Sequence, residues 1–189
     1  KLPWTNNMTE PKVPDNSDVL SMRQWITHLD KTGRLSTTKM GVPLNFTLAA
    51  ISKKLDGRQA TLFPKPDGHE TSVVSGIVSK REWIAEAIGV KEDELLKRFK
   101  DAVNNPIPWQ EIKNAPAQDV QCTENIDLNH LLPIPVHNEH DNGKYITAGL
   151  VIARNPQTGD QNVSINRLQV SGKDRLGILI LPRDLHKFF

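Results

Sequence analysis

The sequence predicts an α+β fold, in which a layer of alternating helices and strands precedes an antiparallel sheet. Up to about residue 103, apolar side chains recur in turn at helical and at strand spacing, as in layered α/β domains. Prolines then interrupt regular structure at residues 104–108 and 114–116. From residue 145 on, three runs rich in Ile, Val, Leu and Thr are separated by turn residues, a pattern typical of an antiparallel meander.

The first domain is predicted over residues 18–120. It follows an N-terminal arm at residues 1–17, which holds prolines and shows little periodicity. The first helix of the domain is expected to begin at a cap formed by Ser17 or Asp18. It is expected to end at Gly33, because glycine readily takes the left-handed conformation that closes a helix.

Later elements of this domain follow from the same signals. Ser79 and Glu82 have the spacing of a capping box and predict a helix that ends at Gly89. The other predicted elements are strands at 34–39, 60–63 and 72–78 and helices at 44–55 and 92–103.

The composition excludes several classes of protein. The chain of 189 residues carries 24 basic and 22 acidic side chains, and this balance gives no electrostatic argument for nucleic acid or an acidic membrane as partner. No apolar run approaches the roughly 20 residues of a transmembrane helix. The single cysteine, Cys122, suits a reducing compartment, so we expect a cytoplasmic protein. We interpret Cys122 as a small buried thiol and not as a nucleophile.

Residues 104–143 are predicted to be a long connection that contains a short strand at 117–123. Segment 137–141 of this connection concentrates histidines and carboxylates, which transition metals accept as ligands. The segment runs into Asp-Asn-Gly and lacks the spaced partners of a zinc pattern. We therefore interpret it as a turn in preference to a metal site.

The second domain, at residues 121–189, contains the meander. Its strands are predicted at 145–154, 161–170 and 175–181. The middle strand carries Asn162, Ser164 and Arg167 among apolar neighbours. In a strand Asn162, Ser164 and Asn166 share one face, and Arg167 faces the other way unless a β-bulge re-aims it. An arginine in such a strand requires an internal carboxylate or an anionic ligand, and the local pattern favours neither.

A basic group surrounds the last strand and consists of Lys173, Arg175, Arg183 and Lys187. Such a group can hold a phosphate through charge-assisted hydrogen bonds. Taken alone, we interpret the group as solvated surface, and likewise the nearby His186.

Several segments together resemble the UbiD-type decarboxylases, enzymes that use prenylated FMN. The segments are 131–137 (LLPIPVH), 141–145 (DNGKY), 145–150 (YITAGL), 155–159 (NPQTG), 162–167 (NVSINR) and 172–177 (GKDRLG), with weaker matches at 107–109 and 114–118. The similarity runs from about residue 18 to the end of the chain. It implies that residues 121–189 form the first antiparallel strands of a split β-barrel flavin-binding domain.

The resemblance also implies a cofactor site. Asn162 would bind a divalent metal, usually manganese, that bridges to the cofactor phosphate; His186 would be a second metal ligand, and potassium is a further candidate ion. Arg167 would be catalytic, because it would hold or polarise the substrate carboxylate beside a cofactor that supplies the difficult chemistry. The residues implied to line the prenylated flavin are Ser164, Ile165, Asn166, Arg167, Leu179, Ile180, Leu181 and Arg183.

The implied activity is the non-oxidative, reversible decarboxylation of aromatic or α,β-unsaturated carboxylic acids. A flavin prenyltransferase would supply the cofactor, and the enzyme would be a homo-oligomer. Members of the family are much longer, so these residues are expected to be an N-terminal portion that is inactive by itself. The acidic metal ligand and the proton donor are expected outside it, since no carboxylate here, Glu139 included, replaces them convincingly. The alternative is a non-catalytic module that binds flavin or phosphate, or a structural subunit.

Overall fold

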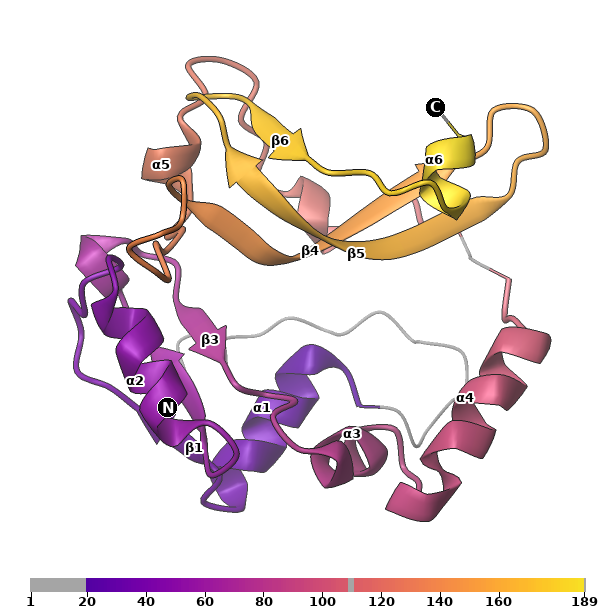
Figure 1. The fold of residues 1–189 in the computed structure, drawn as a ribbon, viewed down its shortest axis with the longest axis horizontal. Helices are drawn as coiled ribbons and strands as arrows, with labels where there is room; N and C mark the ends of the chain where they lie inside the picture. The colour runs from indigo at the N-terminus through magenta and orange to yellow at the C-terminus, as the bar shows by residue number, and fades with distance from the viewer. Residues whose placement is uncertain (1–19, 109–110, 189) are drawn as a thin grey trace.

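The computed structural model describes residues 20–108 and 111–188, and it confirms the mixed α+β fold (Figure 1). Residues 20–104 form an N-terminal lobe of helices and a small sheet. Residues 145–188 form a sheet lobe, which lies on the other side of the molecule in Figure 1. Residues 105–144 connect the two lobes. The predicted arm at residues 1–17 lies outside the described residues.

The sheet of the N-terminal lobe has three strands in the order β1-β2-β3. Strand β2 (Ala60–Phe63) pairs in parallel with β1 (Leu35–Thr37) and antiparallel with β3 (Val73–Ser75). A parallel pair needs a crossover, and helix α2 (Thr47–Leu55) provides it between β1 and β2. Every residue of β2 is buried, so this strand is the centre of the lobe.

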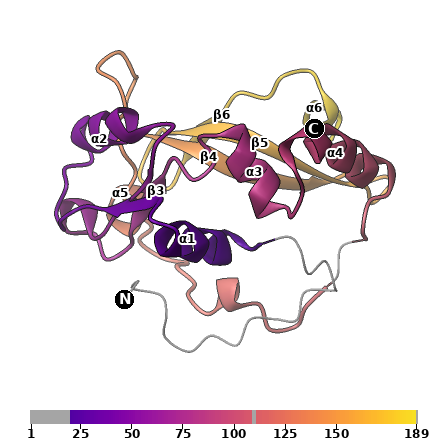
Figure 2. The ribbon, with the colours of Figure 1, turned by 90° about the horizontal axis from the view of Figure 1, so that it is seen from below.

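Both faces of β2 are covered. Leu62 packs with Trp25 of helix α1 (Met22–Lys31) and with Trp83 of helix α3 (Arg81–Ala87). The side chain of Phe63, the next residue along the strand, points to the opposite face and packs in a second cluster with residues of the loop before α2 and of α2 itself. Figure 2 shows α1 and α3 next to each other and α2 apart from both. The lobe therefore has the layered α/β core that the sequence predicts.

An ion cluster ties α1 to α3. The Arg34 guanidinium donates hydrogen bonds to both carboxylate oxygens of Glu86, at 2.6 and 2.7 Å. It lies 5.7 Å from the ring centroids of Trp25 and of Trp83, within reach of a cation–π attraction to each. His28 Nε2 is 2.7 Å from the same carboxylate. The hydrogen bond from Arg34 is the main cause that lowers the pKa of Glu86 to about 2.

Two predicted helix starts are wrong. Helix α1 begins at Met22 after a capping box of Ser21 and Gln24, whereas Ser17 and Asp18 lie outside the described residues. Helix α3 has Lys80 as its N-cap and no side-chain cap, and the Ser79 hydroxyl, one residue earlier, donates to the Gly76 carbonyl at 2.9 Å.

Helix ends and the last helix of the lobe match the prediction more closely. Gly33 and Gly89 have positive φ angles of 70° and 71° just after α1 and α3. The pattern at 92–103 forms a short 3-10 turn (Glu92–Glu94) and helix α4 (Leu95–Asn104). The Leu96, Phe99 and Val103 side chains of α4 are nevertheless exposed, and Leu95 is half-buried.

The connection contains no strand at 117–123, contrary to the prediction. Pro116 instead opens a 3-10 turn (Pro116–Gln118), because its fixed φ suits the first position of a helical turn. Cys122 is exposed, so the interpretation as a buried thiol is wrong. A short helix, α5 (Leu128–Leu131), follows.

Segment 137–141 forms the predicted turn. The backbone N–H of Asn138 donates to the Asp141 carboxylate, and that of His140 donates to the side-chain oxygen of Asn138. Among residues 20–108 and 111–188, no group of three His, Cys, Asp or Glu side chains could hold a metal ion.

The connection also reaches the N-terminal lobe at a strained turn. The N–H of Phe46 donates to the Val136 carbonyl at 2.9 Å, beside an isolated bridge between Asn45 and Val136. Phe46 has φ 60° and ψ −39°, and the N–H of Thr47 donates to the Asn45 carbonyl across it, at 2.6 Å. This is a γ-turn with positive φ, a rare and strained conformation for a residue with a side chain.

The sheet lobe is an antiparallel meander, as predicted. Its strands are β4 (Tyr145–Arg154), β5 (Gln161–Val170) and β6 (Leu176–Ile178). The first two have the predicted bounds, and the third is shorter than predicted. Asn155 stabilises the turn between β4 and β5, because its side-chain oxygen accepts from the N–H groups of Gln157 and Thr158. In the part of the chain that the structure describes, no helix is long and apolar enough to cross a bilayer.

Candidate functional site

The sheet lobe holds a hollow of about 490 Å³ between β5 and the segment that ends the chain. Its lining includes every residue predicted for the site except His186. The lining residues are Asn162, Ser164, Ile165, Asn166, Arg167, Leu179, Ile180, Leu181, Arg183, Asp184 and Leu185. Three separate stretches thus meet here: β5, residues 179–181 and the start of helix α6 (Asp184–Lys187).

Strand β5 buries its polar side more than its apolar side. Asn162, Ser164 and Asn166 alternate along the strand and are half-buried, whereas Val163 and Ile165 are 55% and 74% exposed. The Asn166 side-chain amide donates to the Ser164 hydroxyl at 2.7 Å and so orients both groups. A strand that turns amides and a hydroxyl toward a hollow is suited to bind a polar ligand.

A β-bulge lies opposite Arg167, on the neighbouring strand. Ile146 pairs with Leu168 and Gly149 pairs with Asn166, so two residues of β4, at positions 147 and 148, face the single residue Arg167. The two backbones are close at this point, because a Cβ on Gly149 would lie 2.9 Å from the Asn166 carbonyl oxygen. The bulge thus lies on β4, and β5 keeps the alternation in which Arg167 faces away from Asn162, Ser164 and Asn166.

Arg167 is exposed and has an aromatic neighbour in place of a carboxylate. Its Cζ atom lies 5.0 Å from the centroid of the Tyr145 ring. Arg167 forms no ion pair with any residue that the structure describes. The sequence left two partners open for Arg167, an internal carboxylate and an anionic ligand. The described residues provide no internal carboxylate partner. The guanidinium is accessible to an anion.

Helix α6 contributes two lining residues that the sequence analysis missed, Asp184 and Leu185. Lys187 pairs with the Asp184 carboxylate at 2.8 Å, and this hydrogen bond lowers the pKa of Asp184. Leu185 is buried. Neither has a periodic sequence signal, since α6 is only one turn long. The position of Asp184 directly after Arg183 was the available signal.

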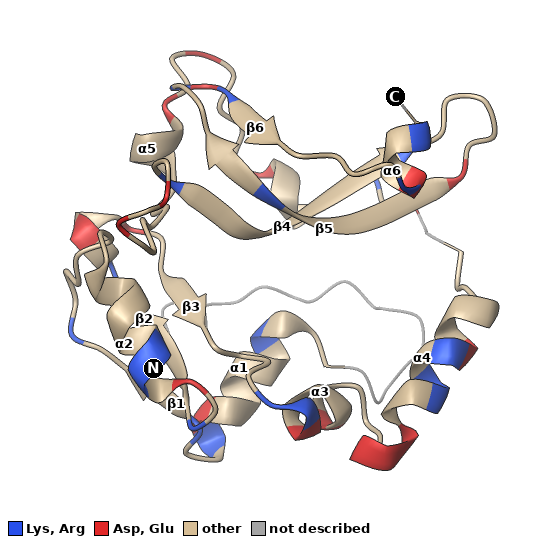
Figure 3. Cartoon of the chain, viewed as in Figure 1, with Lys and Arg blue, Asp and Glu red and all other residues tan. Residues whose placement is uncertain are grey.

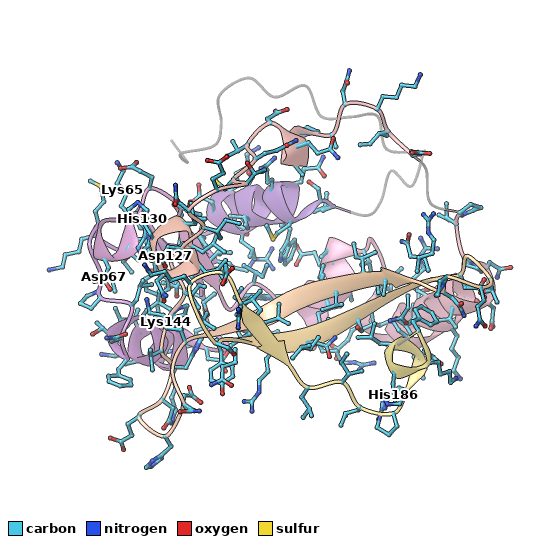
Figure 4. All side chains as sticks on the ribbon, turned by 90° about the horizontal axis from the view of Figure 1, so that it is seen from above. Lys65, Asp67, Asp127, His130, Lys144 and His186 are labelled. Atoms are coloured by element: carbon cyan, nitrogen blue, oxygen red, sulfur yellow. The ribbon has the colours of Figure 1, made fainter. Side chains whose placement is uncertain are left out.

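His186 lies on α6 but outside the lining of the hollow. Figure 4 shows its side chain on α6, on the opposite side of the view from the other labelled residues. Lys173, Arg175 and Lys187 are also outside the lining, and Arg175 lies 3.8 Å from Asp174. Of the basic group, only Arg183 borders the hollow.

The chemistry of the lining fits a phosphorylated ring compound. Two guanidinium groups, Arg167 and Arg183, can bind anionic oxygens. Amide and hydroxyl groups of β5 can bind a polar ring edge, and residues 179–181 offer apolar contact to a ring face. Figure 3 shows few charged residues along the middle of the β4–β5 ribbon.

Comparison with protein families gives two matches that follow one another along the chain. A family described as 3-octaprenyl-4-hydroxybenzoate carboxy-lyase N-terminal domain matches residues 26–103. The Rift-related domain of the same carboxy-lyase matches residues 110–188.

Several curated relatives are decarboxylases. Anhydromevalonate phosphate decarboxylase of Methanothermobacter thermautotrophicus is 34% identical over 161 residues, which cover 85% of this chain. Phenolic acid decarboxylase of Bacillus subtilis is 31% identical over 178 residues, which also cover 85% of this chain. The chain spans 37% of the length of each of these relatives.

Solved structures are also similar to this chain in fold and sequence. One is an evolved dimeric form of the UbiD-class enzyme HmfF from Pelotomaculum thermopropionicum, in complex with prFMN. It matches this chain with a TM-score of 0.85 and 44% sequence identity, and the match covers 88% of this chain and 40% of the HmfF chain. The closed form of vanillic acid decarboxylase from Sedimentibacter hydroxybenzoicus has a TM-score of 0.75 and 26% identity, with 84% and 37% covered.

Proposed function

Because the chain belongs to the UbiD family, we propose that it forms the N-terminal part of a non-oxidative decarboxylase of aromatic or α,β-unsaturated carboxylic acids. One observation carries this proposal. The hollow beside β5 brings together two guanidinium groups, a polar strand face and an apolar segment, and its lining holds every residue expected to bind prenylated FMN. HmfF, which is 44% identical in sequence, has been solved with prFMN bound.

Different residues of the hollow would bind different parts of the cofactor. Residues 179–181 would pack against the ring system, and Ser164 and Asn166 would hydrogen-bond its polar edge. Arg183 would pair with the phosphate, because a guanidinium matches phosphate oxygens. When bound, prenylated FMN supplies the electron sink for the loss of CO2. Arg167 would hold the substrate carboxylate, for which it is free of competing ion pairs with the described residues.

Two oxygen donors of the lining fit a divalent cation such as Mn²⁺. They are the Asn162 amide and the Asp184 carboxylate, which approach the hollow from β5 and from α6. His186, outside the lining, remains a second predicted ligand, and potassium remains a further predicted ion.

The exposed apolar face of β4 and β5 supports a split barrel over residues 121–189. Leu150 pairs across the strands with Ile165, and Ile152 with Val163, and all four side chains are exposed. Apolar pairs of this kind are normally covered in a barrel. We propose that further strands of the enzyme cover them, that a flavin prenyltransferase supplies the cofactor, and that the enzyme is a homo-oligomer.

A second candidate function is a non-catalytic module that binds flavin or phosphate. The observation in its favour is that, among residues 20–108 and 111–188, Asp184 is the only carboxylate in the lining of the hollow, and it is paired with Lys187. These residues therefore place no free carboxylic acid there to protonate a product carbon.

Coexpression of the full-length protein with a flavin prenyltransferase tests the proposal. The purified protein should show the absorbance and the mass of prenylated FMN and should release CO2 from members of a panel of aromatic and unsaturated acids. Arg167→Ala should keep the cofactor and lose decarboxylation, whereas Arg175→Ala, outside the hollow, should keep both. Wild-type turnover in Arg167→Ala would refute the role of Arg167. Bound prenylated FMN without turnover on any acid would favour the module.

A further inference from the structure

Tyr145 is the only tyrosine of the chain and the first residue of β4. It pairs with Gln169 of β5, two residues beyond Arg167, so Tyr145 and Arg167 are diagonal neighbours on one face of the sheet. The half-buried ring lies under the Arg167 guanidinium, 5.0 Å from its Cζ atom.

The bulge in β4 explains why the guanidinium rests on this ring. A residue in a regular antiparallel pair has one side chain directly across from it, but Arg167 faces the two bulged residues at 147 and 148. Among the described residues Arg167 has no carboxylate partner, and the negative face of the Tyr145 ring is the contact that attracts its charge.

We propose that Tyr145 is a positioning residue for Arg167. In the ligand-free protein the Tyr145 ring holds the guanidinium beside β4. When a substrate carboxylate binds, the guanidinium leaves the ring and pairs with the carboxylate. The exchange is energetically favourable, because two charge-assisted hydrogen bonds to a carboxylate are stronger than an exposed cation–π contact. This inference rests on the proposed function insofar as Arg167 is the residue that binds the substrate carboxylate.

Fluorine NMR makes the contact directly observable. In the full-length protein grown with 3-fluorotyrosine, the resonance of the ring at position 145 is the one that is missing from Tyr145→Phe. The resonance is measured in the wild type, in Arg167→Gln and in Arg175→Gln, each first without ligand. Sodium benzoate, a plain aromatic carboxylate, is then added, with sodium chloride at equal ionic strength as the control.

We expect Arg167→Gln to shift the resonance and Arg175→Gln to leave it unchanged. Benzoate, but not chloride, should move the wild-type resonance to the position seen in Arg167→Gln, and it should not move the resonance of that variant. An unchanged resonance in ligand-free Arg167→Gln would overturn the inference, because the guanidinium would then not rest on the ring.

Calorimetric titration of benzoate separates this inference from the proposed function. If benzoate binds the wild type but not Arg167→Gln, and the wild-type resonance stays in place, the exchange at Tyr145 is refuted and the carboxylate role of Arg167 stands. If no binding depends on Arg167, the carboxylate role fails, and the exchange fails with it.

Discussion

Replacing Gly149 with alanine should loosen the sheet beside the candidate site. The added Cβ would lie 2.9 Å from the Asn166 carbonyl oxygen and 3.0 Å from Leu168 Cδ1. The Leu168 side chain can rotate, but the carbonyl belongs to the backbone of β5, so the strands must move apart. Overpacking of this kind costs about 1–3 kcal/mol of unfolding free energy. For a chain of this size, that corresponds to a fall in Tm of about 2–12 °C.

Gly172→Ala is the matched control for Gly149→Ala. Neither glycine has a positive φ, and a Cβ at Gly172 would meet only Arg175 side-chain atoms, the nearest at 3.8 Å, an ordinary contact. This variant should be neutral or more stable by about 0.4–1 kcal/mol, because alanine restricts the unfolded chain.

The assay combines urea unfolding, followed by far-UV circular dichroism, with hydrogen exchange of peptides from β4 and β5. Gly149→Ala should lower the urea midpoint and speed exchange in both strands, and Gly172→Ala should do neither. Equal midpoints and equal exchange rates in Gly149→Ala and the wild type would refute the close approach of the two strands.

Substitutions at three further positions test the N-terminal lobe. Glu86→Gln should lose about 1 kcal/mol at pH 7, a small value because the Glu86 side chain is 41% exposed and water screens the pair with Arg34. Since the pKa of Glu86 falls from 4.5 to about 2 on folding, its stabilisation is complete above pH 4.5 and is lost as the pH falls through about 2. The urea midpoints of wild type and Glu86→Gln, measured by tryptophan fluorescence, should therefore converge in acid. Phe46→Gly should be more stable than Phe46→Ala by about 1 kcal/mol, because glycine tolerates the positive φ of 60°; equal Tm values would contradict the strain. Ser21→Ala should cost about 1 kcal/mol, because it removes the hydroxyl that accepts from the Gln24 N–H; an unchanged Tm would show that the capping box contributes nothing.

The sequence predicts the bounds of helices and strands best where one local signal acts alone. The runs at 145–154 and 161–170 are long, rich in β-branched residues and bounded by turn residues, and both form strands with those bounds. The capping box at Ser79 does not form because helix α3 begins at Arg81, which makes Lys80 the N-cap. The strand at 117–123 fails because Pro116 begins a helical turn there and no described strand pairs with the segment.

Prediction of the candidate site from the sequence is limited in the same way. Asn162, Ser164 and Arg167 stand out in the sequence as polar residues within an apolar strand, and the hollow includes all three. The contact between Arg167 and Tyr145 depends on the register across a bulge, which no local pattern encodes. Asp184 reaches the hollow because the chain folds back over β5 after β6, and that path is set by tertiary structure.

The uneven distribution of the hydrophobic core has a consequence for synthesis on the ribosome. Apart from Ile134 and Leu185, the buried hydrophobic residues of the described chain all lie between Trp25 and Ala85. These residues leave the exit tunnel first and can form a closed core while the strands of the sheet lobe are still being translated. The sheet lobe, whose pairs leave apolar side chains in water, is then the late and dependent folding unit. The N-terminal lobe can thus be folded before the candidate site on β5 is complete.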